Sequence, residues 1–269
     1  MGDPNGQADL PISQWARRQL DDYDRRQPGT LFSEGVVLTV EQGYRLQDEV
    51  SKLRVQRGER VVGYKVGCTS KTIRSQLGID QSINGRLYHN EQHEDGCALS
   101  RSSFAQLAIE GELAVRLSRA PTASDFAQPG FPDCIDRVFP VIELHHHVIR
   151  GAKPSAGELI ASNAIHAGVV AGAGVSMAEL PQNPASTMLD LAIRRDEQRL
   201  DGCSGTVLLE TICSSLKWLT TALEARGQRL YPGQIVLTGS VPGLIAVSEN
   251  CEILVETKRF GSVRAKFLT

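Results

Sequence analysis

The feature that most constrains the fold is the spacing of apolar residues after about residue 60. There the chain consists of short runs rich in valine and isoleucine, separated by glycine, proline and asparagine, which is the pattern of β-strands joined by turns. The runs read VVGYKVG, LAIEGELAVRL, RVFPVIELHHHVI, GVVAGAG, LDLAIRR, QIVLTGSV, EILVET and GSVRAKF. Because helical patterns do not alternate with these runs, we expect an α+β fold with a mixed or antiparallel sheet, and not a doubly wound one.

Helical patterns occupy the N-terminal region and one later stretch. Ser13 can cap a first helix, and Thr39 followed by Gln42 is a capping-box signature for a second one. Gly58 stands just past the expected end of that second helix. Residues 206–227 carry an apolar stripe at helical spacing and predict one long amphipathic helix.

Length and composition limit the classes of protein to consider. With 269 residues the chain can form one large domain, and we predict a helical N-terminal segment over residues 1–59 followed by a β-rich domain over residues 60–269. No apolar stretch is long enough to cross a bilayer, so the expected location is the cytoplasm. The six cysteines are widely spaced without a CxxC pair and are expected to be reduced thiols. The net charge is -2 and basic residues are scattered, which argues against nucleic acid as a partner.

Three glutamates in the predicted strands are the main candidates for chemistry. Glu110 and Glu112 are one residue apart, so on a strand they point to the same face. Glu143 lies in a run that reads as a strand buried on both faces, where an unpaired carboxylate is costly. If the three converge, a hard divalent cation such as Mg²⁺ or Mn²⁺ relieves their repulsion. Alternatively, the pair lies on a solvated face with Arg116 as a salt-bridge partner.

Lys65 is the next candidate, because it lies inside a short apolar strand between Gly63 and Gly67. The glycines allow the backbone to approach another group closely, and a partly desolvated ammonium can act as an acid, a base or an anchor for a carboxylate substrate. The alternative is a lysine that reaches the sheet edge or pairs with a structural acid.

The histidine run and two turn-like stretches offer further polar groups. His145 and His147 share the strand face of Glu143 and can serve beside a metal or carry protons, whereas a zinc or iron site built on the run is not favoured. In NGRL a turn signal precedes Arg86, which could bind a carboxylate. In VLTGSVPG residues 238–240 end a strand and offer N–H groups and hydroxyls to an anion. Either stretch can equally be an ordinary turn.

Together these motifs resemble the 2-keto-4-pentenoate hydratase and 4-oxalocrotonate decarboxylase family of the fumarylacetoacetate hydrolase superfamily. The resemblance runs from about residue 38 to the C-terminus. Its most specific element is an E-x-E pair followed about thirty residues later by a third glutamate. The motifs that carry it are LTVEQGYRLQ, GYKVGCTS, QLGIDQSINGRL, IEGE, VFPVIE, ASNA, GQIVLTGS and FGSVRAKF.

The resemblance implies a mixed β-sandwich roll with flanking helices and a tendency to form homo-oligomers, in some cases together with a sister hydratase or decarboxylase. It also implies Mg²⁺ or Mn²⁺ held by the three glutamates, a catalytic Lys65 and a small 2-oxo acid substrate from aromatic meta-cleavage. The metal-binding and catalytic residues then all lie within residues 60–269. The substrate contacts it implies are Ser70, Arg86, Leu87, Asn163, Thr238, Gly239 and Ser240.

Departures from the family motifs leave the reaction open. Residues 82–85, SING, lack the acid of the PDFG-like stretch of hydratases, and INGRL is closer to the IWGRL of decarboxylases. Ser162 replaces the aspartate of the D-N-A motif, and the three histidines of residues 145–147 replace D-S-R. CSGTVLLET replaces the S-G-x-G motif and its following His-Pro.

Four hypotheses about function follow from the resemblance and these departures. A hydratase is the broad expectation and a decarboxylase the close alternative. A hydrolase of acylpyruvates would need a water-activating dyad, for which the sequence carries no signature. A degenerate homologue or partner subunit without activity is favoured by the departures, whereas the three glutamates and Lys65 argue against it.

Overall fold

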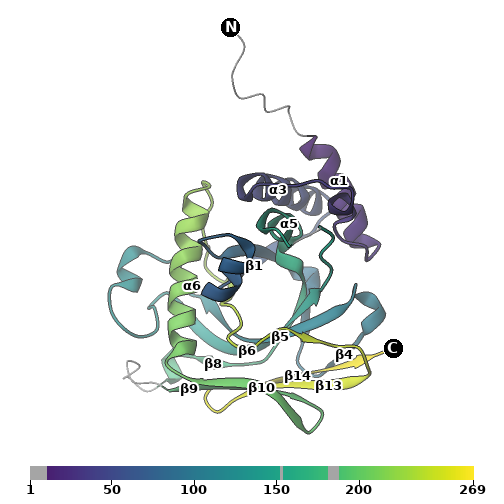
Figure 1. Ribbon diagram of the computed structural model, residues 1–269. Coiled ribbons are helices and arrows are strands. Elements are labelled where there is room, and N and C mark those ends of the chain that lie inside the picture. Colours follow the sequence, from purple (N-terminus) through teal and green to yellow (C-terminus); the bar gives the residue numbers. More distant parts are fainter. Residues whose placement is uncertain (1–10, 152–153, 181–187) are drawn as a thin grey trace.

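The computed structural model describes residues 11–151, 154–180 and 188–269, and its strands form two sheets (Figure 1). The helices are α1 (Ile12–Asp24), α2 (Thr30–Ser33), α3 (Val40–Gln56), α4 (Lys71–Leu77), α5 (Ala156–Ala161) and α6 (Val207–Glu224). The larger sheet has the order β2 (Ile83–Tyr88), β1 (Val61–Gly67), β11 (Ile235–Leu237), β5 (Leu107–Leu117), β6 (Ile135–His146), β7 (His166–Ala171) and β3 (Gln92–Glu94), with β12 (Ile245–Ala246) on β5 and β8 (Val175–Ser176) on β6. The smaller sheet has the order β10 (Gln198–Gly205), β9 (Leu189–Arg195), β13 (Cys251–Thr257), β14 (Gly261–Leu268) and β4 (Cys97–Ser100).

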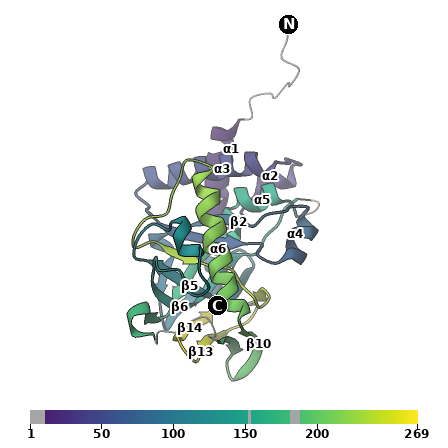
Figure 2. The same ribbon diagram turned by 90° about the vertical axis from the view of Figure 1, so that its left-hand side faces the viewer.

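Most strand pairs are antiparallel, and parallel pairs join β1 to β11, β14 to β4 and β3 to β7. The larger sheet curls, with α1, α3 and α5 lying across one end and the smaller sheet packed at the other (Figure 1). In the turned view α6 runs along the side of both sheets (Figure 2). The expected α+β fold with a mixed sheet and flanking helices is confirmed.

The two faces of the larger sheet have different roles. One face packs against the smaller sheet and α6, and alternate residues of β5 and β6, such as Ile109, Leu113 and Ile142, enter this main core. The other face is concave and holds a smaller apolar cluster that includes Val141 and Leu237. Because Glu110 and Glu112 alternate with the core residues of β5, they lie on the concave face.

The element predictions are largely confirmed at the strands with clear periodicity. β1, β5 and β9 have the predicted bounds, and the long helix is α6. The capping box of Thr39 and Gln42 forms, with both reciprocal hydrogen bonds. The prediction that Ser13 caps the first helix is wrong, because the amide of Trp15 already donates to the carbonyl of Pro11 and Ser13 lies inside the first turn.

The prediction of a turn at Asn84 and Gly85 is also wrong. Both residues lie in β2, where Gly85 pairs with Lys65 of β1. An added Cβ on Gly85 would lie 2.4 Å from the carbonyl oxygen of Asn163, so the glycine serves close packing and not a hairpin turn.

All six cysteines are free thiols. Within the described ranges, no helix has the length and apolar character needed to cross a bilayer.

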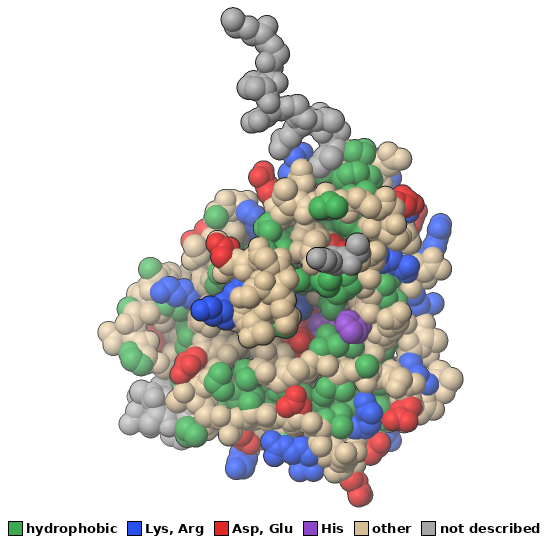
Figure 3. All heavy atoms as spheres, viewed as in Figure 1, with side chains coloured by type: hydrophobic (Ala, Val, Ile, Leu, Met, Phe, Trp, Pro, Cys, Tyr) green, Lys and Arg blue, Asp and Glu red, His purple; other side chains and the backbone are tan. Residues whose placement is uncertain are grey.

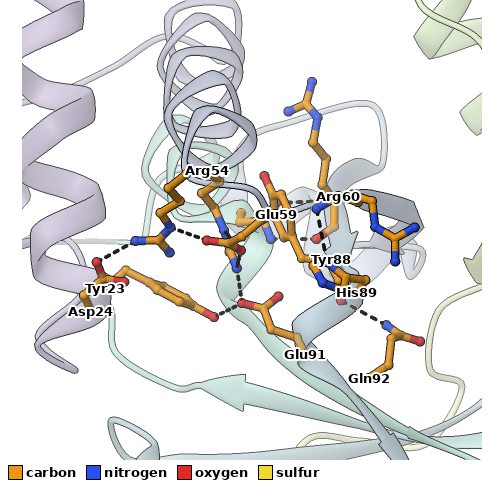
Figure 4. A network of polar contacts seen from close by, with 12 residues as sticks. Tyr23, Asp24, Arg54, Glu59, Arg60, Tyr88, His89, Glu91 and Gln92 are labelled. Carbon is orange, nitrogen blue, oxygen red and sulfur yellow. Dashed lines mark hydrogen bonds and ion pairs between the residues drawn. The ribbon is translucent and has the colours of Figure 1, made fainter.

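A buried ion network joins the N-terminal helices to the larger sheet (Figure 4). Arg54 of α3 is 3% exposed and its Nη2 lies 2.5 Å from carboxylate oxygens of both Glu59 and Glu91. Its guanidinium stacks on the ring of Tyr88, 3.6 Å from the centroid, and Tyr23 of α1 donates to Glu91. Arg54 therefore pairs with two buried carboxylates at this junction, and Arg57 pairs with one of them, Glu59.

We predict that Arg54→Met lowers the free energy of unfolding by about 3 to 5 kcal/mol, because it leaves the buried carboxylate of Glu91 without a cationic partner. Urea denaturation followed by circular dichroism measures the change. Arg194→Met is the matched control, since the side chains of Arg194 and its partner Glu256 are both 38% exposed and breaking this pair should cost less than about 1 kcal/mol. Equal losses for the two variants would contradict the importance of the buried network.

Candidate active site

The three predicted glutamates meet on the concave face of the larger sheet. Glu110 of β5 lies directly opposite Glu143 of β6, and Glu112 follows two residues along β5, opposite Val141. Like charges directly opposite each other on neighbouring strands are destabilising, so this pair requires compensation. Glu143 is fully buried and Glu112 is 2% exposed, whereas the side chain of Glu110 is 21% exposed. The alternative of a solvated acidic face is therefore wrong.

Lys65 reaches the same cluster from β1. It is 4% exposed, and its Nζ lies 3.3 Å from Oε1 of Glu143. Gly63, two residues earlier, permits the close approach of β1 to β11, because a Cβ there would lie 1.9 Å from the carbonyl oxygen of Ile235. The alternative in which Lys65 reaches out to the sheet edge is wrong, since its ammonium points into the acidic cluster.

The proposed salt bridge between Arg116 and the glutamate pair does not form. Arg116 lies at the far end of β5, where its Nε is 2.6 Å from Oδ2 of Asp136. Compensation for the glutamates therefore has to come from Lys65 and from the histidines beside it.

Two histidines complete the surroundings of Glu143. His166 of β7 has its Nδ1 2.7 Å from Oε1 of Glu143, and His145 of β6 has its Nε2 3.7 Å from Oε2. His145 also lies 3.3 Å from Oε2 of Glu110. Both rings are buried, with exposures of 0% and 1% respectively. Of the other two histidines in the run, His146 is also buried and His147 is exposed.

The charges of these groups depend strongly on one another. Burial alone would lower the pKa of Lys65, but the neighbouring glutamates, Glu143 first, outweigh burial and raise that pKa above its ordinary value. Burial alone would raise the pKa of Glu143, but the charge of Lys65 and then the two adjacent imidazoles lower it. Burial and the charges of Glu143 and Glu110 raise the pKa of Glu112 well above its usual range. The cluster thus holds an ammonium next to an ionised Glu143.

A cavity of about 700 Å³ opens beside this cluster. Its walls come from β1 and α4, from the end of β6 and from the loop after β11. The residues that carry polar groups into it include Lys65, Ser70, Glu110, His145, His147 and Ser240. The space-filling view shows histidine side chains in a hollow, with acidic and basic groups nearby (Figure 3).

Of the substrate-contact residues implied by the resemblance, Ser70 and Ser240 line the cavity. Gly239 does not line the cavity, but its amide donates to Oε2 of Glu112 at 2.8 Å and so orients that carboxylate. An added Cβ on Gly239, whose φ is 97°, would lie 2.5 Å from Cγ2 of Thr69. Thr238 supports the same turn, since its hydroxyl donates to the carbonyl of Leu113 at 2.7 Å.

The remaining three lie away from the cavity walls. The guanidinium of Arg86 donates to Gln47 and Asp48 of α3, so this helix already satisfies it. Leu87 is fully buried in the small apolar cluster of the concave face. Asn163 holds the backbone of β2, because its amide accepts from the N–H of Arg86 and donates to the carbonyl of that residue.

His166 is the residue near the cluster that sequence reasoning missed. In the pairing of β6 with β7, Glu143 lies opposite Val169 and Leu144 opposite Gly168, but His145 lies opposite His166. This register shift leaves Ala167 unpaired and turns His166 onto the concave face, where strict alternation from Val169 would not place it. The sequence carries no signal for this shift apart from a lone histidine two residues before a glycine.

The residue types and their unsatisfied atoms fit a divalent cation. Within the described residues, Oε2 of Glu143 and both ring nitrogens of His145 are buried and make no hydrogen bond. One ligand atom from each of Glu110, Glu143 and His145 can lie within 4.8 Å of the others. Buried polar atoms without partners are rare in native proteins, and a cation would satisfy Oε2 of Glu143 and one of the two ring nitrogens of His145.

Comparison with known proteins supports the resemblance seen in the sequence. The profile described as "Fumarylacetoacetate (FAA) hydrolase C-terminal" matches residues 90–268, which is most of the chain. The chain belongs to the fumarylacetoacetate hydrolase family. Among its curated relatives is a 2-keto-4-pentenoate hydratase of Burkholderia vietnamiensis, 30% identical over 224 residues that cover 83% of this chain and 84% of the relative. Another is a 4-oxalocrotonate decarboxylase of Pseudomonas putida, 27% identical over 232 residues that cover 86% of each.

Solved structures of this family share the fold. The 4-oxalocrotonate decarboxylase from Pseudomonas putida G7, complexed with magnesium and adipate, has a TM-score of 0.84 at 22% identity and covers 96% of this chain and 97% of its own. The fumarylpyruvate hydrolase from Pseudomonas aeruginosa, complexed with Mn²⁺ and pyruvate, has a TM-score of 0.56 at 14% identity and covers 76% of this chain and 88% of its own. The expected roll of the fumarylacetoacetate hydrolase type is therefore confirmed.

Proposed function

We propose that the protein is a divalent-metal-dependent lyase that acts on a short 2-oxo or 2-hydroxydienoic acid, as a hydratase of the 2-keto-4-pentenoate type. Decarboxylation of a substrate like 4-oxalocrotonate is the second candidate, favoured by the INGRL stretch of β2. The relatives named above include enzymes of both kinds.

One observation carries the proposal: Glu110 and Glu143 lie opposite each other beside the ammonium of Lys65 and a cavity large enough for a small acid. Two facing carboxylates, one of them fully buried, are costly in a purely structural role. A cavity lined by such charged groups is the usual place for catalysis.

Glu110, Glu112 and Glu143 would hold the metal ion, Mg²⁺ or Mn²⁺. The hydrogen bond from the Gly239 amide keeps Glu112 in one orientation, and the contact with His166 fixes Glu143 while its Oε2 is left without a partner. When bound, such an ion neutralises the carboxylates and, as a Lewis acid, stabilises negative charge on the oxygens of an α-keto acid.

Lys65 would hold and move the proton that the reaction needs. Its raised pKa keeps it an ammonium at neutral pH, so it can donate a hydrogen bond or a proton to the substrate but does not begin as a base. A hydratase also needs a group that handles water at the distal carbon. His147 lines the cavity and is exposed to solvent, which suits it to this role.

The test is an NMR product assay with and without Mg²⁺ on 2-hydroxypenta-2,4-dienoate and on 2-hydroxymuconate in equilibrium with 4-oxalocrotonate. Ion-dependent formation of 4-hydroxy-2-oxopentanoate from the dienoate supports the hydratase. Ion-dependent release of carbon dioxide from the dicarboxylate supports the decarboxylase. No change in either substrate would overturn both candidates.

We also propose that the chain forms a homo-oligomer or associates with a sister hydratase or decarboxylase. This proposal rests on the family resemblance. Light scattering on the purified chain, alone and mixed with a sister enzyme, tests it.

A further inference from the structure

We propose that His145 contributes a nitrogen ligand to the metal site, and that the site therefore selects a first-row transition ion over Mg²⁺. This inference rests on the proposed metal dependence and deepens it, because it concerns which ion binds. It assigns His145 a direct role in binding the ion, beyond the supporting role predicted from the sequence.

The geometry places the imidazole among the carboxylates. Nε2 of His145 lies 3.3 Å from Oε2 of Glu110 and 3.7 Å from Oε2 of Glu143. Neither ring nitrogen of His145 has a hydrogen-bond partner in the part of the chain that the structure describes, so no hydrogen bond competes with a metal ion for the ring. A ring that is 1% exposed and unpartnered, with Nε2 beside two acidic oxygens, is poised to share a cation with them.

The strand register explains why the ring reaches this position. His145 lies two residues after Glu143 on β6, so both side chains leave the strand on the concave face. Its partner across β5 is Ala108, which is two residues before Glu110. The small side chain of Ala108 leaves room for the imidazole to extend along the sheet toward Glu110.

His166 does not compete for the same place. Its Nδ1 contacts Oε1 of Glu143, the oxygen that Lys65 also contacts, whereas His145 lies on the side of Oε2. Glu143 thus has one oxygen held by protein groups and one directed to the shared site. Glu110, Glu143 and His145 then contribute two oxygen ligands and one nitrogen ligand to the site, in addition to the proposed ligand Glu112.

The ligand set determines the ion preference. Mg²⁺ favours sites made only of oxygen and binds imidazole weakly, whereas imidazole nitrogen suits iron, cobalt, nickel and zinc. For a mixed N/O site, affinity rises from Mn²⁺ through Fe²⁺ to Co²⁺. A site with His145 as a ligand should therefore bind Co²⁺ much more tightly than Mg²⁺, and losing the ring should remove most of that difference.

The test uses the full chain stripped of metal, with Mn²⁺ as the spectroscopic probe and with Co²⁺ and Mg²⁺ titrated by calorimetry. The electron spin echo of Mn²⁺ bound to the wild-type protein is expected to show ¹⁴N modulation from a directly bound imidazole. His145→Gln should lose this modulation and bind Co²⁺ at least about tenfold more weakly, with Mg²⁺ affinity changed less than about threefold. The matched control His147→Gln, at an exposed histidine two residues away, should keep both the modulation and the Co²⁺ affinity.

Several outcomes would overturn the inference. Mn²⁺ that binds the wild-type protein without ¹⁴N modulation would reject His145 as a ligand and leave the proposed lyase intact, and this result does not depend on the folding of any variant. If only His147→Gln loses the modulation, the nitrogen ligand is His147 and not His145. Failure of the wild-type protein to bind any of the three ions would overturn the proposed metal dependence, and this inference with it.

Discussion

Glu143→Gln is expected to abolish divalent-ion binding and to lower turnover by at least about 10³-fold, because it removes the charge at the centre of the cluster. Glu143 is fully buried and contacts Lys65, His145 and His166, so no other carboxylate can take its place without rebuilding the site. Glutamine keeps the shape of the side chain, which limits the effect on folding. Calorimetric titration with Mn²⁺ and the NMR product assay measure the two losses.

The matched control for this prediction is Glu249→Gln, at a glutamate whose side chain is 68% exposed and pairs only with Arg195 among the described residues. It should bind Mn²⁺ and turn over substrate like the wild-type protein. Unchanged Mn²⁺ affinity in Glu143→Gln would remove Glu143 from the metal site.

Lys65→Met is expected to leave ion binding nearly intact while it lowers turnover by about 10²- to 10⁴-fold, the range typical for loss of an acid–base group. The ammonium does not contribute a metal ligand, and its removal makes the cluster more negative, which favours a bound cation. Methionine preserves most of the length and volume of the buried stem. Single-turnover kinetics with the ion saturating separates the chemical step from binding.

Lys266→Met, at an exposed lysine of β14, is the control for the loss of one positive charge and should behave like the wild-type protein. If Lys65→Met loses ion binding and turnover to the same extent, the role of Lys65 is to hold the cluster together. If turnover is unchanged, Lys65 does not take part in the reaction.

The parts of the fold that the sequence predicts well are those set by local pattern. Strict alternation in β5 places Glu110 and Glu112 on one face, and the apolar run around Glu143 predicts a buried strand. That the three glutamates meet depends in addition on the pairing of β5 with β6. The capping box at Thr39 is equally local, since both of its partners lie within one turn.

The parts that the sequence does not predict depend on contacts between distant segments. Asn84 and Gly85 form a strand because β1 offers hydrogen bonds along its edge, and this tertiary pairing outweighs the local turn preference. The sequence around Arg86 shows no partner for its guanidinium, but in the fold α3 passes close enough for Asp48 to pair with it. His166 reaches Glu143 only through a shift in register between β6 and β7. The spacing of apolar residues in the sequence does not predict this shift.

The departures from the family motifs take on a physical meaning in this arrangement. The histidine run that replaces D-S-R puts His145 beside the candidate metal ligands and His147 on the cavity wall. Ser162, in place of an aspartate, precedes Asn163, whose amide holds the backbone of β2. The histidine replacements alter the groups around the glutamates and leave Glu110, Glu112, Glu143 and Lys65 in place.

The measurement that tests the central claim most directly is anomalous diffraction from crystals of the wild-type protein grown with Mn²⁺. A single strong anomalous peak in direct contact with carboxylate oxygens of Glu110 and Glu143 is the predicted result, and contact with Nε2 of His145 would add the nitrogen ligand. Crystals that hold Mn²⁺ only at surface carboxylates, with Lys65 alone facing Glu143 in the cluster, would contradict the claim that these glutamates form a metal site.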